Sequence, residues 1–131
     1  MVYQRPTIAD VAVEVGKYLA DGDPATALRL AFRFVEIFDR AEIDERAVLV
    51  VESPKPTGDI RYDALLAAIA EYVCARHDML PPSWVDDEDR FLEKWWFVSG
   101  FRSLHADAIA NSPISFSRRG VFITAGALTY A

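Results

Sequence analysis

The segment Ile60–Leu80, IRYDALLAAIAEYVCARHDML, restricts the fold more than any other part of the chain. Its large apolar residues recur at helical spacing and form one stripe: Tyr62, Leu65, Leu66, Ile69, Tyr72 and Val73. The alanines between them leave small faces that a second helix can approach closely. Asp59 or its neighbour begins this helix, and Arg76 and His77 lie in its last turn, where positive charge suits the exposed carbonyl groups. The segment therefore predicts a helix packed against other helices.

Two helices are predicted before this one, each with a recognisable start. Thr7-Ile8-Ala9-Asp10 has the pattern of a capping box, and the helix that follows stops near Gly22. Asp23-Pro24 supplies an N-cap and a proline at the first helical position of the second helix. That helix is apolar over a wide surface: Leu28, Leu30, Phe32, Phe34, Val35, Ile37 and Phe38. So wide a surface indicates a central helix or one that meets a partner.

The region between the second helix and Asp59 contains an ambiguous segment and a linker. Asp44 to about Val51 is predicted as a third helix, although Val48–Val51 could equally form a short strand. The linker, SPKPTGD at 53–59, holds two prolines and a glycine, which forbid a helix. We therefore expect one helical domain over residues 1–131: an N-terminal segment 1–52, the linker 53–59 and a C-terminal module 60–131.

The C-terminal module continues as short helices. Trp84-Val85 precede four acids, Asp86–Asp89, which predict the first turn of a helix carrying Phe91, Leu92, Trp95 and Trp96. Another helix is expected over Arg102–Asn111, with Leu104, Ala108 and Ile109 facing inward. Ser112-Pro113 starts a last short turn that ends at Gly120, and only Val121–Ile123 is typical of a strand. The predicted fold class is mostly α: a compact bundle of about six to seven helices with at most one short strand.

Length, composition and net charge disfavour several classes of protein. A chain of 131 residues, 52% of them hydrophobic, can bury a core without disulfides, and its single cysteine excludes an internal one. No apolar run approaches the roughly 20 residues of a membrane span, and the N-terminus lacks the layout of a signal peptide, so a cytoplasmic protein is expected. The net charge of −6 disfavours binding of nucleic acid through the protein's own surface.

Side chains suited to catalysis are few and scattered. The six glycines are spread singly, so no phosphate-binding loop is expected. Cys74 lies beside the apolar stripe and is interpreted as a buried, inert thiol. His77 and His105 have no ligand neighbour at helical spacing, and His105 and Asp107 diverge on a helix. We predict no catalytic, cofactor-binding or metal-binding residues, and no enzyme.

Aromatic and charged residues near the C-terminus indicate a surface for a partner protein. Trp95-Trp96-Phe97 cannot all face inward from one helix, because adjacent residues lie about 100° apart on it. At least one ring is therefore expected at the surface, and Trp is enriched at interface hot spots. Two arginines, Arg118 and Arg119, are too few for a nucleic-acid site; we expect them to pair with the Asp86–Asp89 run or to bind helix carbonyl groups.

Two longer stretches carry a family resemblance: TGDIRYDALLAAIAEYVCARHDMLPPSWV and RFLEKWWFVSGFRSLHADAIANSPISFSRRGVFI, within residues 57–123. Together they resemble the C-terminal module of actinobacterial antitoxin and antitoxin-like proteins. The resemblance implies a partner, a nucleotidyltransferase toxin of the abortive-infection class. In longer members a DNA-reading helix-turn-helix precedes the module, and no such motif is found here.

The leading hypothesis is a non-enzymatic, antitoxin-like protein that neutralises such a toxin by direct contact. Its acidic surface would complement the basic cleft of a toxin that acts on nucleotides or RNA. An alternative is a small regulator or adaptor that acts on nucleic acid, as a dimer through the Phe32-Phe34-Phe38 helix; an enzyme is the third and least favoured. The predicted partner-binding residues are Trp95 and Trp96 as anchors, Arg118 and Arg119 as polar contacts, and Asp86, Asp87 and Asp89 as electrostatic complement.

Overall fold

The computed structural model describes residues 4–124 and 126–129. Within this part of the chain the helices are α1 (Ile8–Ala20), α2 (Pro24–Asp39), α3 (Ile43–Val51), α4 (Ile60–Arg76), α5 (His105–Asn111) and α6 (Ile114–Ser117). Three 3₁₀ turns, at Ser83–Asp86, Glu88–Arg90 and Arg102–Leu104, and two strands of two residues, β1 (Trp96–Phe97) and β2 (Val121–Phe122), complete it. The predicted mostly α fold class is confirmed.

The predicted starts of the first helices are confirmed in detail. Thr7 Oγ1 accepts a hydrogen bond from the Asp10 amide at 3.1 Å, and the Asp10 carboxylate accepts one from the Thr7 amide at 3.0 Å, which closes the capping box. Asp23 caps α2 through the Thr26 amide at 3.1 Å. Residues Val48–Val51 are helical, so the ambiguity between helix and strand is resolved in favour of α3.

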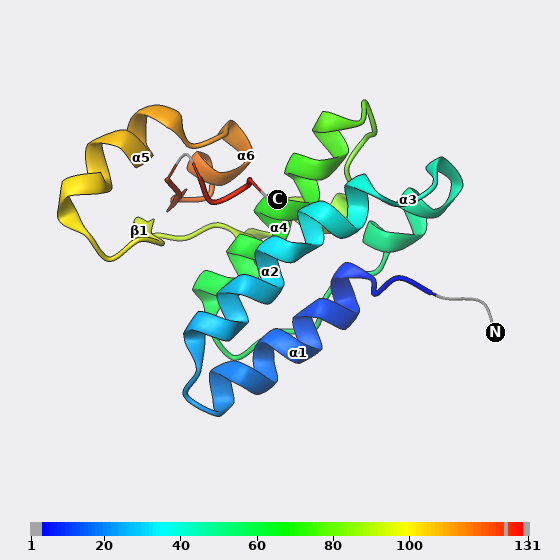
Figure 1. The fold of residues 1–131 in the computed structure, drawn as a ribbon, viewed down its shortest axis with the longest axis horizontal. Coiled ribbons are helices and arrows are strands. Elements are labelled where there is room, and N and C mark those ends of the chain that lie inside the picture. The colour runs from blue at the N-terminus through cyan, green and yellow to red at the C-terminus, as the bar shows by residue number, and fades with distance from the viewer. Residues whose placement is uncertain (1–3, 125, 130–131) are drawn as a thin grey trace.

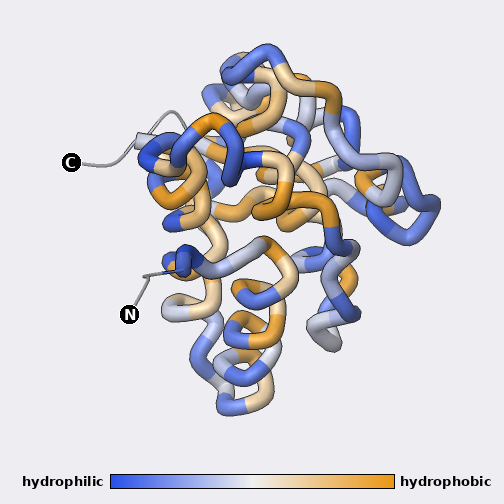
Figure 2. The backbone as a smooth tube through the Cα atoms, turned by 90° about the vertical axis from the view of Figure 1, so that its right-hand side faces the viewer, coloured by the Kyte–Doolittle hydropathy of each residue, from blue (hydrophilic) through white to orange (hydrophobic). Residues whose placement is uncertain are grey.

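Helix α4 lies at the centre of the molecule and contacts α1, α2, α6 and β2 (Figure 1). Helices α1 and α2 lie side by side, and α2 also packs on α4, so part of its wide apolar surface is buried within the chain. Phe34 and Phe38 are fully buried there, so of the three rings Phe32, Phe34 and Phe38 only Phe32 stays partly accessible. Figure 2 shows hydrophobic stretches gathered where the helices meet, with hydrophilic segments in the outer loops.

The prediction of a helix after Asp86 is wrong. Two 3₁₀ turns stand in its place, and the chain then extends into β1, which pairs in parallel with β2 through Trp96↔Val121 and Phe97↔Phe122. The tryptophans explain the difference, because each binds a different neighbour. Trp84 Nε1 donates to the Val50 carbonyl at 2.8 Å, whereas the ring of Trp96 packs on Tyr62 with centroids 5.2 Å apart. Tertiary contacts thus override the local helical pattern.

Two further expectations need correction. Helix α4 ends at Arg76, because Asp78 takes a left-handed conformation (φ 54°) that stops the helix before Leu80. In α5 only Ala108 is buried; Leu104, in the 3₁₀ turn before it, and Ile109 are exposed rather than inward. The lobe formed by α5 and that turn extends from the side of the bundle near β1 (Figure 1).

Across residues 4–124 and 126–129, none of the helices has both the length and the apolar character needed to span a bilayer.

Candidate protein-binding site

The C-terminal tail docks on the bundle and supports the site. Phe116, Val121 and Ile123 are buried, as predicted. Gly120 has φ +78°, and a Cβ atom there would lie 3.4 Å from Leu92, so glycine allows the tail to pass close to the segment before β1. The prediction of an ordered tail also covered Ala125, Tyr130 and Ala131, which lie outside the described residues.

Arg119 is the fully buried centre of the tail's attachment. Its Nη1 donates to Glu71 at 2.6 Å and to the Ser115 carbonyl at 2.7 Å, and its Nη2 donates to the Val85 carbonyl at 2.7 Å. Burial lowers the pKa of the Arg119 guanidinium, and the hydrogen bond to Glu71 opposes that effect. Arg119 was predicted as a polar contact for a partner; with no exposed surface, its side chain instead joins α4, α6 and the first 3₁₀ turn.

Arg118 lies at the surface beside it. It pairs with Glu71 and with Asp86, which confirms the predicted pairing with the acidic run. Burial lowers its pKa, but the hydrogen bonds to Asp86 and Glu71 outweigh this and leave the pKa raised. The guanidinium groups of Arg118 and Arg119 lie 5.1 and 5.0 Å from the centre of the Phe91 ring.

A second buried arginine, Arg90, anchors the acidic segment 86–89 to the rest of the protein. Arg90 is 4% exposed and donates to the Asp63 carbonyl at 3.1 Å and the Pro54 carbonyl at 2.9 Å. Its guanidinium also lies 4.9 Å from the centre of the Trp84 ring. Arg90 therefore holds together the linker 53–59, α4 and the segment that carries the acids. Arg90 was not among the predicted site residues, although a lone cation directly after four acids is a detectable signal.

Above these anchors lies a groove of about 1290 Å³, here called the acidic groove. It is lined by Asp59, Ile60, Arg61, Asp87, Glu88, Asp89, Phe91, Leu92, Glu93, Lys94, Trp95 and Trp96. Four of the seven predicted partner-binding residues, Trp95, Trp96, Asp87 and Asp89, thus meet on one surface. Asp86 and Arg118 pair with each other and do not line the groove.

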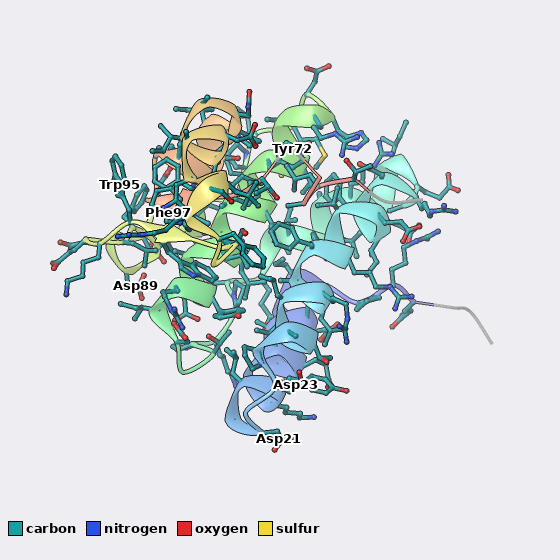
Figure 3. The ribbon with its side chains drawn as sticks, turned by 60° about the vertical axis from the view of Figure 1, so that its left-hand side comes forward. Asp21, Asp23, Tyr72, Asp89, Trp95 and Phe97 are labelled. Carbon is teal, nitrogen blue, oxygen red and sulfur yellow. The ribbon has the colours of Figure 1, made fainter. Side chains whose placement is uncertain are left out.

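Trp95 is the most exposed aromatic side chain of the acidic groove, with 64% of its surface accessible. Its ring is held from one side, by Phe122 with centroids 4.8 Å apart and by Phe97 at 6.4 Å. In Figure 3, Trp95 points outward at the edge of the molecule, with Phe97 beside it. Trp96 is half-buried between Tyr62 and the Arg61 guanidinium, which lies 5.2 Å from its ring centre. Trp95 is therefore the ring that a partner can reach.

The charge of the acidic groove is strongly negative. Its cation Arg61 pairs with Asp59 at 2.9 Å, and the hydrogen bond from Arg61 lowers the pKa of that carboxyl group. Among the described residues, no ion pair is formed by the other four carboxylates of the lining: Asp87, Glu88, Asp89 and Glu93. Lys94 is the second cation of the lining, after Arg61. Four exposed carboxylates in the same groove as an exposed tryptophan favour a basic ligand.

The remaining titratable candidates do not join this surface. Cys74 is buried as predicted, and desolvation, with the charge of Glu71, raises its pKa to about 11. His77 Nε2 lies 2.7 Å from Asp39 and packs on Phe38, while His105 stacks on Phe97 with centroids 3.9 Å apart. Asp107 accepts from Asn111 instead of meeting His105. Within the described part of the chain, no three His, Cys, Asp or Glu side chains cluster as metal ligands would.

Comparison with protein-family models, with curated proteins and with solved structures found no match to this chain.

Proposed function

We propose that the chain is a non-enzymatic, antitoxin-like protein that binds a basic segment of a partner protein in the acidic groove. The observation that carries this proposal is that the exposed Trp95 ring lines the same groove as four carboxylates that form no ion pair with any described residue. Trp at the centre of a surface is a frequent hot spot, and its face attracts arginine and lysine side chains. The partner implied by the family resemblance is a toxin of the nucleotidyltransferase type, whose cleft must bind polyphosphate and is therefore basic.

The structure also supports a rigid presentation of this surface. Trp95 is backed by Phe97 and Phe122, and the acidic segment is tied down by Arg90 and by the Arg118–Asp86 pair. A side chain already fixed in position loses little freedom on binding, which favours affinity. The same carboxylates would repel phosphate groups, so the groove disfavours the alternative of a nucleic-acid adaptor.

Co-expression with the product of the neighbouring gene tests the proposal. We expect the two proteins to co-elute in size-exclusion chromatography and the chain to relieve the partner's inhibition of growth. Trp95→Ala should weaken the complex by roughly thirtyfold or more, the effect of a hot spot of about 2 kcal/mol. Phe101→Ala is the matched control, because Phe101 is also strongly exposed (72%) and does not line the acidic groove.

The charge of the groove is tested separately. The double variant Asp87→Asn/Asp89→Asn should weaken binding about two- to fivefold per carboxylate and flatten its dependence on salt. Asp21→Asn/Asp44→Asn removes the same charge from residues outside the acidic groove, and Figure 3 shows Asp21 far from Asp89. Failure to co-elute, or equal losses in both double variants, would remove the proposal.

A further inference from the structure

A second pocket lies between α2 and the segments that follow β1 and β2, and it shares no residue with the acidic groove. This α2 pocket has a volume of about 510 Å³, within the range of roughly 300–1,000 Å³ that is typical of small-molecule sites. Its lining comprises Leu28, Arg29, Phe32, Arg33, Glu36, Val98, Ser99, Ile123, Thr124, Ala127, Leu128 and Thr129.

The wall of the α2 pocket is apolar and supported from behind. Ile123 is buried at 2% exposure, and the Phe32 ring stacks on Phe116 with centroids 6.4 Å apart. Leu28, Val98 and Leu128 pack against the hydrophobic core while remaining partly accessible. An apolar body placed here would lose contact with water on several sides without any rearrangement of the core.

Two arginines give the α2 pocket a positive rim. Arg29 and Arg33 are one helical turn apart, are exposed, and both line the pocket. Neither forms an ion pair with any described residue; Arg29 Nη2 donates only to the Thr26 hydroxyl, at 2.9 Å. The carboxylate of the rim, Glu36, is held by Arg40 at 3.2 Å. On a chain of net charge −6, this pocket carries the opposite sign.

We infer that the α2 pocket binds a small organic anion: a carboxylate joined to an apolar chain or ring. Arginine binds carboxylates through two parallel N–H donors, and two guanidinium groups one turn apart offer such donors at the rim. The apolar part of the ligand would lie along Leu28, Phe32 and Ile123. Both parts are required, since the wall alone does not select charge and exposed arginines alone bind weakly.

Decanoate, below its micelle concentration, is the probe, and decanol is its uncharged match. We expect saturable binding of decanoate in calorimetry, with shifts of the Leu28, Ile123 and Leu128 methyl resonances. Decanol should bind at least tenfold more weakly, because it lacks the charge-assisted hydrogen bonds. Arg29→Gln/Arg33→Gln should reduce decanoate binding to the level of decanol, whereas Arg102→Gln, at an exposed arginine outside the pocket, should leave it unchanged.

Both arginines are exposed, so the double variant is expected to unfold at the wild-type temperature, which a thermal melt checks. The inference is overturned if decanoate does not bind, or if it binds no more tightly than decanol. It is also overturned if the double variant has no effect on decanoate binding, or if the methyl shifts lie outside the pocket. Because the two sites share no residue, Trp95→Ala should leave decanoate binding unchanged, and a negative result here does not bear on the acidic groove.

Discussion

Replacing Glu71 by glutamine tests whether the buried Arg119 depends on one carboxylate. Glu71 Oε1 accepts from Arg119 Nη1 at 2.6 Å and from Arg118 Nε at 3.0 Å, and Arg119 has no exposed surface. Removing one partner of a buried ion pair typically costs about 3–5 kcal/mol. Arg119 keeps two carbonyl acceptors and Glu71 is partly exposed, so we expect the free energy of unfolding to fall by about 2–3 kcal/mol.

Urea unfolding, followed by tryptophan fluorescence and by circular dichroism, measures this loss. With a slope of about 1–3 kcal/mol per molar urea, the midpoint should fall by roughly 0.7–3 M. Glu14→Gln is the matched control, because it breaks the exposed Glu14–Lys17 pair, which is worth less than about 1 kcal/mol. A Glu71→Gln loss no larger than that of Glu14→Gln would show that Arg119 does not depend on the Glu71 carboxylate.

A double-mutant cycle with Arg119→Met separates the buried charge from the loss of packing. Arg119→Met removes the charge that Glu71→Gln leaves unpaired, so the combined loss should be smaller than the sum of the two single losses by more than about 1 kcal/mol. Additive losses would show that the two side chains act independently.

Three further changes probe the supports of the fold. Gly120→Ala should cost about 1–2 kcal/mol in thermal unfolding, because φ is +78° and the new methyl group meets Leu92 at 3.4 Å; a neutral result would contradict this. Asp59→Asn keeps an N-cap oxygen but removes the carboxylate whose pKa the hydrogen bond from Arg61 lowers below its ordinary 3.8. That stabilisation is present above the ordinary pKa and is lost as the pH falls through the lower folded value. Wild type should therefore exceed the variant in stability by less than about 1 kcal/mol near pH 7, and this difference should shrink as the pH falls below 3.8; a difference that widens in acid would contradict the assignment. Cys74, with a pKa of about 11, should react with a thiol reagent only when the chain opens, and fast labelling in the absence of urea would contradict its burial. Its protonated thiol contributes to the free energy of unfolding below the ordinary thiol pKa, and this contribution is lost as the pH rises to about 11.

The N-terminal helices were predictable because their signals are local. The Thr7–Asp10 capping box and the Asp23-Pro24 start each act within four residues, and the structure shows both. The segment from Asp86 to Phe97 was not predictable in this way. Its acids and apolar residues have a helical pattern, but Arg90, Trp84 and β1 bind partners in the linker, in α3 and in the tail. Such distant contacts leave no periodic signal in one sequence.

The candidate site was predictable only where its signals are local in the sequence. Adjacent aromatic residues implied an exposed ring, and Trp95 is exposed beside Asp87 and Asp89. The burial of Arg119 was not foreseen, because its partner Glu71 lies 48 residues earlier. A clue was nevertheless present: Glu71 is a lone carboxylate in the middle of a helix that is otherwise apolar there, and a buried or half-buried carboxylate requires a cation.

Fluorine NMR of the complex with the neighbouring gene product shows whether a basic partner binds over Trp95. Fluorotryptophan labels Trp84, Trp95 and Trp96, and single substitutions assign the resonances. We expect the Trp95 resonance to shift and to lose its sensitivity to solvent when the partner binds. The resonance of Trp84, which is buried and hydrogen-bonded to the Val50 carbonyl, should stay in place. A complex that forms with the Trp95 resonance unchanged would contradict binding over Trp95.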